Sequence, residues 1–102
     1  MNNFVVISSN LLEKIAHHIE DHDSTGNLDV DYSNEVLKVT APKGIFILNK
    51  QSSVEEIWLA SPISGPHHFA QKNGMWVSSK NVELISLLNN ELGFDFNFLR
   101  TI

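Results

Sequence analysis

The chain has 102 residues, of which 42% are hydrophobic and 19% are charged, with a formal net charge of −5 and no cysteine. This length fits one domain with a real core, here residues 1–102, and the hydrophobic share is too high for a disordered acidic protein. The lack of cysteine excludes a disulfide scaffold and an iron–sulfur cluster held by the chain's own thiolates.

The first expected element is a long helix at the start of the chain. Its apolar residues recur three or four positions apart, which predicts one continuous apolar stripe. The turn-forming run at residues 23–27 is expected to end this helix. The stripe consists of Phe4, Ile7, Leu11, Ile15 and Ile19, and the opposite side carries Glu13, His17, Glu20 and Asp21.

Short segments separated by turn signals follow the helix. Apolar and polar residues alternate in them, which is typical of strands whose two sides face different surroundings. Asn73-Gly74 is a strong signal for a tight hairpin between the last two. The expected strands are residues 28–32, 36–40, 45–49, 54–60, 66–71 and 75–77.

A second apolar stripe at residues 82–92 predicts the last helix, with Asn81 as its N-cap and Gly93 at its end. The alternating tail at residues 94–98 is expected to lie extended against the helices. Strands joined by tight turns pair antiparallel, and two helices with one apolar stripe each can share one face of a sheet. The expected fold is therefore α+β: a two-layer sandwich with two helices on one face of an antiparallel sheet of five to six strands.

The run Ile57-Trp58-Leu59 places a large aromatic residue between two aliphatic ones. Neighbouring side chains on a strand point to opposite faces, so Trp58 faces away from the core if Ile57 and Leu59 face it. A large aromatic residue on an open sheet face is typical of a partner surface. The alternative is that a loop or a second layer simply covers Trp58.

The sequence around Trp58 resembles the signature of the frataxin family in residue type and spacing. The resemblance covers residues 4–98 and implies the same two-layer fold. It is carried by Asn49-Lys50-Gln51, Ile57-Trp58-Leu59, Ser61-Pro62 and Ser64-Gly65-Pro66, and it extends to Val36-Leu37-x-Val39, Trp76 and the closing helix.

The acidic residues are concentrated in the first third of the chain. Residues 1–35 hold seven acids and one base, a net charge of −6, whereas residues 36–102 hold five acids and six bases, a net charge of +1. This distribution argues against nucleic acid and anionic membrane as partners and favours cations or a basic protein surface. Because these acids repel one another, removing the charge of Asp21 or Asp23 is expected to stabilise the fold.

The helix acids and His17 share one face, and Asp29 and Asp31 face the same way on the first strand. Crowded carboxylates favour a hard, hydrated cation, although a solvated face that keeps the protein soluble is the alternative. Frataxins bind iron, and the resemblance implies that this acidic ridge holds ferrous or ferric iron (Fe2+/Fe3+) weakly at the surface. The predicted metal site is Glu13, His17, Glu20, Asp21, Asp23, Asp29 and Asp31.

Other chemistry is weakly indicated. His18 and His22 are four residues apart and could bind one ion together, but the zinc-protease pattern HExxH is absent, and surface imidazoles are the alternative. The sequence has no GxSxG nucleophile motif and no glycine-rich phosphate loop.

The resemblance also implies a partner surface. Asn49, Gln51 and Trp58 match family positions that contact a cysteine desulfurase and its iron–sulfur scaffold protein, and His68 lies near a position where many members carry a basic residue. The implied protein is not an enzyme but an accessory protein that regulates or supplies iron for iron–sulfur cluster assembly. The alternatives are an interaction module with incidental metal binding and a ferroxidase-type storage enzyme. The Glu-x-x-His pairs expected for such a ferroxidase are missing from this sequence.

The resemblance further leads us to expect a monomer in the bacterial cytoplasm. Iron-dependent oligomerisation is the alternative assembly, and the mitochondrial matrix after removal of a leader is the alternative location.

Overall fold

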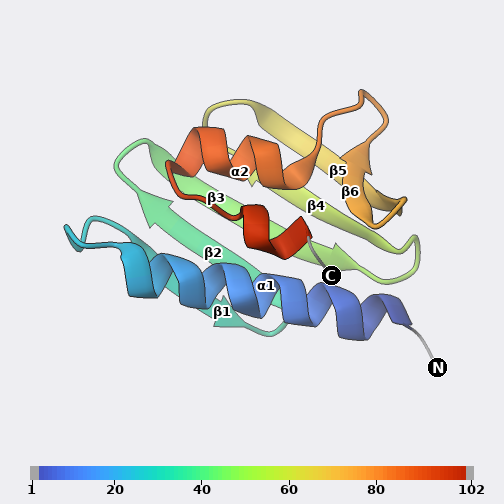
Figure 1. Ribbon diagram of the computed structural model, residues 1–102, viewed down its shortest axis with the longest axis horizontal. Helices are drawn as coiled ribbons and strands as arrows, with labels where there is room; N and C mark the ends of the chain where they lie inside the picture. The colour runs from blue at the N-terminus through green and yellow to red at the C-terminus, as the bar shows by residue number, and fades with distance from the viewer. Residues whose placement is uncertain (1–2, 101–102) are drawn as a thin grey trace.

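The structure is a computed structural model that describes residues 3–100. It consists of two helices and a short 3-10 helix packed on one side of a sheet (Figure 1). The elements are α1 (Asn3–His22), β1 (Asp29–Ser33), β2 (Val36–Ala41), β3 (Gly44–Gln51), β4 (Glu56–Ser61), β5 (Gly65–Lys72), β6 (Met75–Ser78), α2 (Leu84–Leu92) and η1 (Asn97–Arg100). The expected fold class is confirmed.

The sheet is a meander in which each strand pairs antiparallel with the next, in the order β1-β2-β3-β4-β5-β6. Tight turns make this order natural because they return the chain directly alongside the strand it has just left. The turn between β5 and β6 forms at Asn73 and Gly74, whose φ angles of 53° and 80° suit a type I′ hairpin.

The core lies between the sheet and the helical layer. Alternate residues of the inner strands are buried there, including Leu48 and Phe46 of β3 and Ile57 of β4, each with no exposed surface. Apolar burial of this kind is the main force that holds the two layers together. The opposite face of the sheet carries no helix (Figure 1). The residues on this face alternate along each strand with the core residues, and they meet solvent because no described element covers them.

The buried face of α1 differs from the predicted stripe at one position. Ile7 is 36% exposed, whereas Ser8 and Leu12 are fully buried. An α-helix turns once every 3.6 residues, so the packed face takes in Ser8 and Leu12 and leaves Ile7 at its margin. The hydroxyl of Ser8 donates to the carbonyl of Phe4 at 2.6 Å, which satisfies this buried polar group within the helix.

The predicted start of the last helix was wrong. Asn81 lies before it in a left-handed conformation with φ 64°, and the N-cap is Glu83, whose carboxylate accepts from the backbone N–H groups of Ile85 and Ser86. A carboxylate at this position satisfies free amides and favours the positive end of the helix dipole. The predicted end was correct, because Gly93 adopts the left-handed C-cap conformation with φ 78°.

Two other expectations need correction. β4 begins at Glu56, and the preceding residues form a turn in which Glu55 has φ 54° and Val54 is 53% exposed. The tail is only partly extended, because it turns into η1 at Asn97 and buries Phe96 completely. The Asn89 side chain fixes this path: its Oδ1 accepts from the Phe96 N–H at 2.7 Å, which a pattern of alternation could not indicate.

Candidate functional site

Part of the predicted acidic ridge forms on the exposed side of α1. Glu13, His17 and Glu20 border one shallow cleft, which the inward side chains Val30 and Tyr32 of β1 close from the other side. The three polar residues are exposed, as the helical spacing predicts. This side of the cleft can offer two carboxylates and one imidazole to a hydrated cation.

The two acids of β1 lie apart from that cleft. Val30 and Tyr32 pack against the core, so Asp29 and Asp31, which alternate with them, are exposed on the outer side of the strand. Asp31 lies opposite Lys38 of β2 in the strand register. Within residues 3–100, no three His, Cys, Asp or Glu side chains converge in a way that could hold a metal ion.

Asp23 has structural partners at the end of α1. Its Oδ2 accepts from the Leu28 N–H at 2.9 Å, and its Oδ1 accepts from the Thr25 hydroxyl at 3.2 Å. Both carboxylate oxygens therefore help to close the turn that leads into β1. Asp21 is exposed one turn from His17, on the ridge but outside the residues that line the cleft.

His18 lies on a different side of α1 from the ridge, against the chain's aromatic tail. Its ring centroid is 5.1 Å from that of Phe96 and 4.9 Å from that of Phe98. Burial lowers the pKa of His18, the neighbouring His22 adds to this effect, and Asp95 and Asp21 oppose it only partly. The imidazole is thus held in its neutral form near neutral pH.

The predicted partner residues lie together on the open face of the sheet. Asn49, Trp58 and His68 are directly opposite one another on β3, β4 and β5, and Gln51 occupies the next position of β3 on the same face. We call these four residues the Trp58 row. Trp58 is partly exposed while Ile57 and Leu59 are buried, as the alternation predicted.

Two contacts hold the Trp58 ring in place. Its indole Nε1 donates to Glu56 Oε1 at 2.8 Å, and its ring stacks on that of His68. The pattern around Trp58 did not single out Glu56, although its position two residues before Trp58 on the same strand places both on one face.

Exposed aliphatic residues extend the Trp58 row on the same face. Ile45 and Ile47 of β3 are 45% and 37% exposed, and Ile47 is two residues from Asn49. These two residues are hard to recognise from the sequence, because residues 45–48 are all apolar and the alternation is hidden. The open face therefore combines an aromatic anchor, amide groups and apolar surface.

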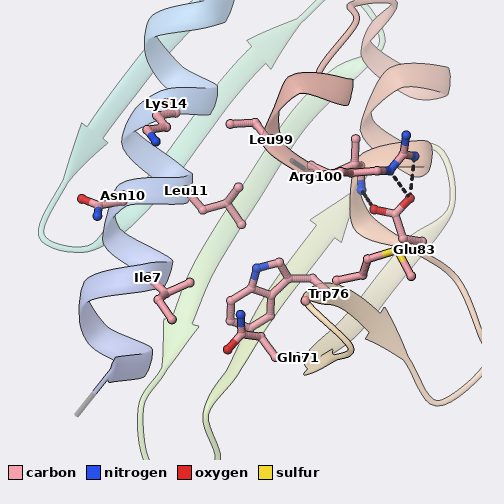
Figure 2. Close-up of a pocket in the computed structure, with 12 residues that line it drawn as sticks. Ile7, Asn10, Leu11, Lys14, Gln71, Trp76, Glu83, Leu99 and Arg100 are labelled. Atoms are coloured by element: carbon pink, nitrogen blue, oxygen red, sulfur yellow. Dashed lines mark hydrogen bonds and ion pairs between the residues drawn. The ribbon is translucent and has the colours of Figure 1, made fainter. Parts of the chain in front are cut away.

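A separate pocket of about 240 Å³ lies between α1, the β5–β6 hairpin and η1. Figure 2 shows Ile7, Leu11 and Trp76 on its apolar side and the Glu83–Arg100 pair at another wall. Arg100 Nη2 lies 2.7 Å from Glu83 Oε1. The residues predicted for metal or partner binding do not line this pocket, and its two most prominent charged groups pair with each other.

The surroundings of Glu83 shift its acidity. Burial raises the pKa of this carboxyl, but hydrogen bonds from Arg100, Ser86 and the backbone of Ile85 outweigh burial and hold the pKa below its ordinary value. The side chain is therefore ionised at neutral pH and ties the start of α2 to η1.

No helix in the described part of the chain is long and apolar enough to cross a membrane.

Comparison of the sequence with known proteins gives a match to the frataxin-like domain family over residues 1–97. The mitochondrial frataxin homolog of Saccharomyces cerevisiae is 42% identical over 66 residues, which cover 63% of this chain and 38% of that protein. Mitochondrial frataxin of Arabidopsis thaliana is 36% identical over 94 residues, which cover 88% of this chain and 49% of that protein. The matches thus span less than half the length of these relatives.

Solved structures agree in fold. Trimeric frataxin from Saccharomyces cerevisiae, complexed with ferrous iron, gives a TM-score of 0.79 at 33% identity, covering 85% of this chain and 82% of that one. Frataxin from Psychromonas ingrahamii, of the CyaY protein family, gives a TM-score of 0.76 at 26% identity, covering 90% of this chain and 89% of that one.

Proposed function

The chain belongs to the frataxin family, and we propose that it is a non-enzymatic accessory protein of iron–sulfur cluster assembly. In this proposal it binds iron weakly and docks on a complex of a cysteine desulfurase and its scaffold protein, where it regulates or supplies iron. The observation that carries the proposal is the Trp58 row, which brings all four predicted partner residues onto one open sheet face.

The Trp58 row suits docking because its central ring is already ordered. The contacts with Glu56 and His68 fix the indole before a partner arrives, so less conformational entropy is lost on binding. Tryptophan is also among the residues that most often dominate the binding energy of an interface. The exposed Ile45 and Ile47 add apolar area beside it.

Iron binding is supported by the exposed carboxylates at the α1–β1 edge and by the ferrous complex of the yeast relative. Open carboxylates suit hard, hydrated ions such as iron. Because no three of the described His, Cys, Asp or Glu side chains converge on one point, we propose that water supplies most of the coordination shell. The expected dissociation constant is on the order of micromolar or weaker, as for other open carboxylate sites.

The second candidate is an interaction module whose metal binding is incidental. The separation of Asp29 and Asp31 from the α1 cleft favours it, because a site selected for iron would bring its ligands together. A ferroxidase has less support. Among the charged residues in the described part of the chain, Lys50 alone is buried. None of the described carboxylates can therefore belong to a buried dinuclear centre.

The decisive experiment measures the affinity of the purified chain for a purified desulfurase–scaffold complex. Trp58→Ala is expected to weaken it at least tenfold, and Val6→Ala, which truncates an exposed apolar residue of α1, serves as the matched control. Equal affinity of wild type and Trp58→Ala would refute docking through this face. The same affinity is then measured with and without iron. If iron changes the affinity of the wild type for the complex but not that of Glu20→Gln, the iron-linked function is supported over the interaction module.

Assembly and location follow from the same proposal. We propose a monomer, with iron-dependent oligomerisation as the alternative, and sedimentation velocity with and without ferrous iron tests this against the trimers described for yeast frataxin. The proposed location is the bacterial cytoplasm, with the mitochondrial matrix as the alternative, since the similar proteins include mitochondrial frataxins.

A further inference from the structure

A pair of histidines lies on the last turns of α1, away from the α1 cleft and from the Trp58 row. His18 and His22 are one helical turn apart, and their rings stack with centroids 4.1 Å apart and planes 27° apart. Side chains four residues apart on a helix are neighbours. The two imidazoles are therefore already side by side, and side-chain rotations that turn both ring edges toward one point would let them share one ion.

The hydrogen bond of His22 determines which of its nitrogens is available. Nδ1 of His22 lies 3.0 Å from the backbone carbonyl oxygen of His18. A carbonyl oxygen can only accept, so Nδ1 must carry the proton, and the neutral ring then keeps its lone pair on Nε2. Metal-ligating histidines are commonly held in this way, with one ring nitrogen donating to a backbone carbonyl and the other directed at the ion.

The second ring is positioned by packing rather than by a hydrogen bond. His18 contacts the rings of Phe96 and Phe98, which pack beside it and favour its position next to His22. The carboxylates of Asp21 and Asp95 are close enough to act on His18 electrostatically. Burial and the neighbouring His22 outweigh these two carboxylates and lower the pKa of His18, so an ion here must be held by the two ring nitrogens rather than by surrounding negative charge.

We propose that His18 and His22 chelate one late first-row divalent ion, of the class Ni2+, Cu2+ or Zn2+. Imidazole ligands suit these ions, whereas the carboxylates of the α1 cleft suit harder ions such as iron. Among the described residues, no third His, Cys, Asp or Glu side chain is placed to bind the same ion as the pair. Water, or a ligand from a partner, therefore completes the coordination shell.

The test is calorimetric titration of the full chain with Ni2+. The wild type is expected to bind one equivalent at this site, and His22→Gln is expected to lose at least tenfold in affinity. His67→Gln is the matched control, because it removes an imidazole of β5 that belongs to neither the α1 cleft nor the Trp58 row. In this control the affinity for Ni2+ should stay unchanged.

Two further measurements locate the ion and check the fold. Ni2+ is paramagnetic, so the side-chain NMR signals of His18 and His22 should broaden before those of the other histidines. Ni2+ should also raise the unfolding midpoint of the wild type but not that of His22→Gln. Wild-type affinity in His22→Gln, or first broadening at His67 and His68, would overturn the proposal.

Discussion

The indole of Trp58 stacks on the imidazole of His68, with ring centroids 4.0 Å apart and planes 7° apart. The two residues are directly opposite in the register of β4 and β5, so the sheet itself brings the rings together. Stacked ring pairs of this kind contribute about 0.5–1.5 kcal/mol beyond the area they bury. The pair therefore helps to hold the indole at the centre of the Trp58 row in one orientation.

Trp58→Ala should separate folding from docking. Trp58 is partly exposed, so its truncation should cost less than the roughly 3–5 kcal/mol typical of a buried aromatic residue. Chemical unfolding monitored by circular dichroism measures this cost. A loss of several kcal/mol with unchanged affinity for the desulfurase–scaffold complex would mean that Trp58 acts as a core residue.

Asn49 and Lys50 are neighbours in sequence but should give opposite phenotypes. Asn49 belongs to the Trp58 row, whereas Lys50 points into the helical layer, where its Nζ donates to Ser9 Oγ at 2.5 Å and lies 2.7 Å from Glu35 Oε1. Lys50→Ala should lower the free energy of unfolding by about 1–3 kcal/mol and leave complex affinity intact, because it removes a buried hydrogen-bonded group.

Asn49→Ala is expected to weaken the complex with little effect on stability. Parallel measurement of unfolding and complex affinity on both variants checks the assignment of faces. If Lys50→Ala weakened docking while its unfolding stayed normal, the two faces of β3 would be wrongly assigned.

The fold could be predicted because its two periods are plain in the sequence. Apolar residues spaced three and four positions apart indicate α1. The alternation around Trp58 indicates a strand with one buried side. The N-cap was missed because Glu83 is not a favoured capping residue, and its role depends on Arg100, which lies far away in sequence. Such long-range contacts leave no local pattern.

The candidate site was predictable to a lesser degree. Alternation places Asp29 and Asp31 on the same side of β1 but does not say which side turns toward α1. That depends on Val30 and Tyr32, which pack on the core and send the two acids outward. The Trp58 row, in contrast, was recognisable by resemblance, although its alignment across β3, β4 and β5 depends on strand register.

Asp23 reverses the expectation that removing an acid stabilises the fold. Its carboxylate accepts two hydrogen bonds that close the α1–β1 turn, so Asp23→Asn should lower the free energy of unfolding by about 0.5–2 kcal/mol. Asp21 is exposed, and Asp21→Asn should be neutral or slightly stabilising. Thermal unfolding at low salt compares the two, and a higher melting temperature for Asp23→Asn would show that repulsion outweighs these hydrogen bonds.

The Glu83–Arg100 pair should make stability depend on pH in the acid range. The folded state lowers the pKa of Glu83 from its ordinary value of 4.5. The stabilisation is therefore complete above that value and is lost as the pH falls through the lower, folded-state pKa. Glu83→Gln should be less stable than wild type at pH 7 by about 1 kcal/mol, as for loss of a helix cap.

Urea unfolding of both proteins across the acid range tests this prediction. The difference between wild type and Glu83→Gln should begin to shrink near pH 4.5, where the unfolded chain takes up the proton, and should be lost once the pH has fallen through the lower folded-state pKa. A constant difference from neutral to acid pH would show that the charge of Glu83 contributes nothing to stability.

Iron should perturb two separable groups of residues at the α1–β1 edge. Glu13, His17 and Glu20 border the cleft on the helix side, whereas Asp29 and Asp31 lie on the outer side of β1. Glu20→Gln removes a carboxylate from the first group and leaves the second unchanged. We therefore expect this variant to reduce the iron-induced NMR shifts of the α1 amides while those of Asp29 and Asp31 persist.

A titration with ferrous iron, followed by amide signals and repeated with a diamagnetic trivalent ion, measures both groups at once. Asp31→Asn is the matched control, and it should give the converse pattern. The signals around Trp58 should stay unchanged in all titrations, because the Trp58 row lies on the open sheet face, away from the α1 cleft, and the adjacent Glu56 is hydrogen-bonded to the indole. If Glu20→Gln abolished the shifts of both groups together, the ridge would act as one site. The β1 edge would then have to rearrange on binding iron, because the free chain keeps the two groups on opposite sides of the strand.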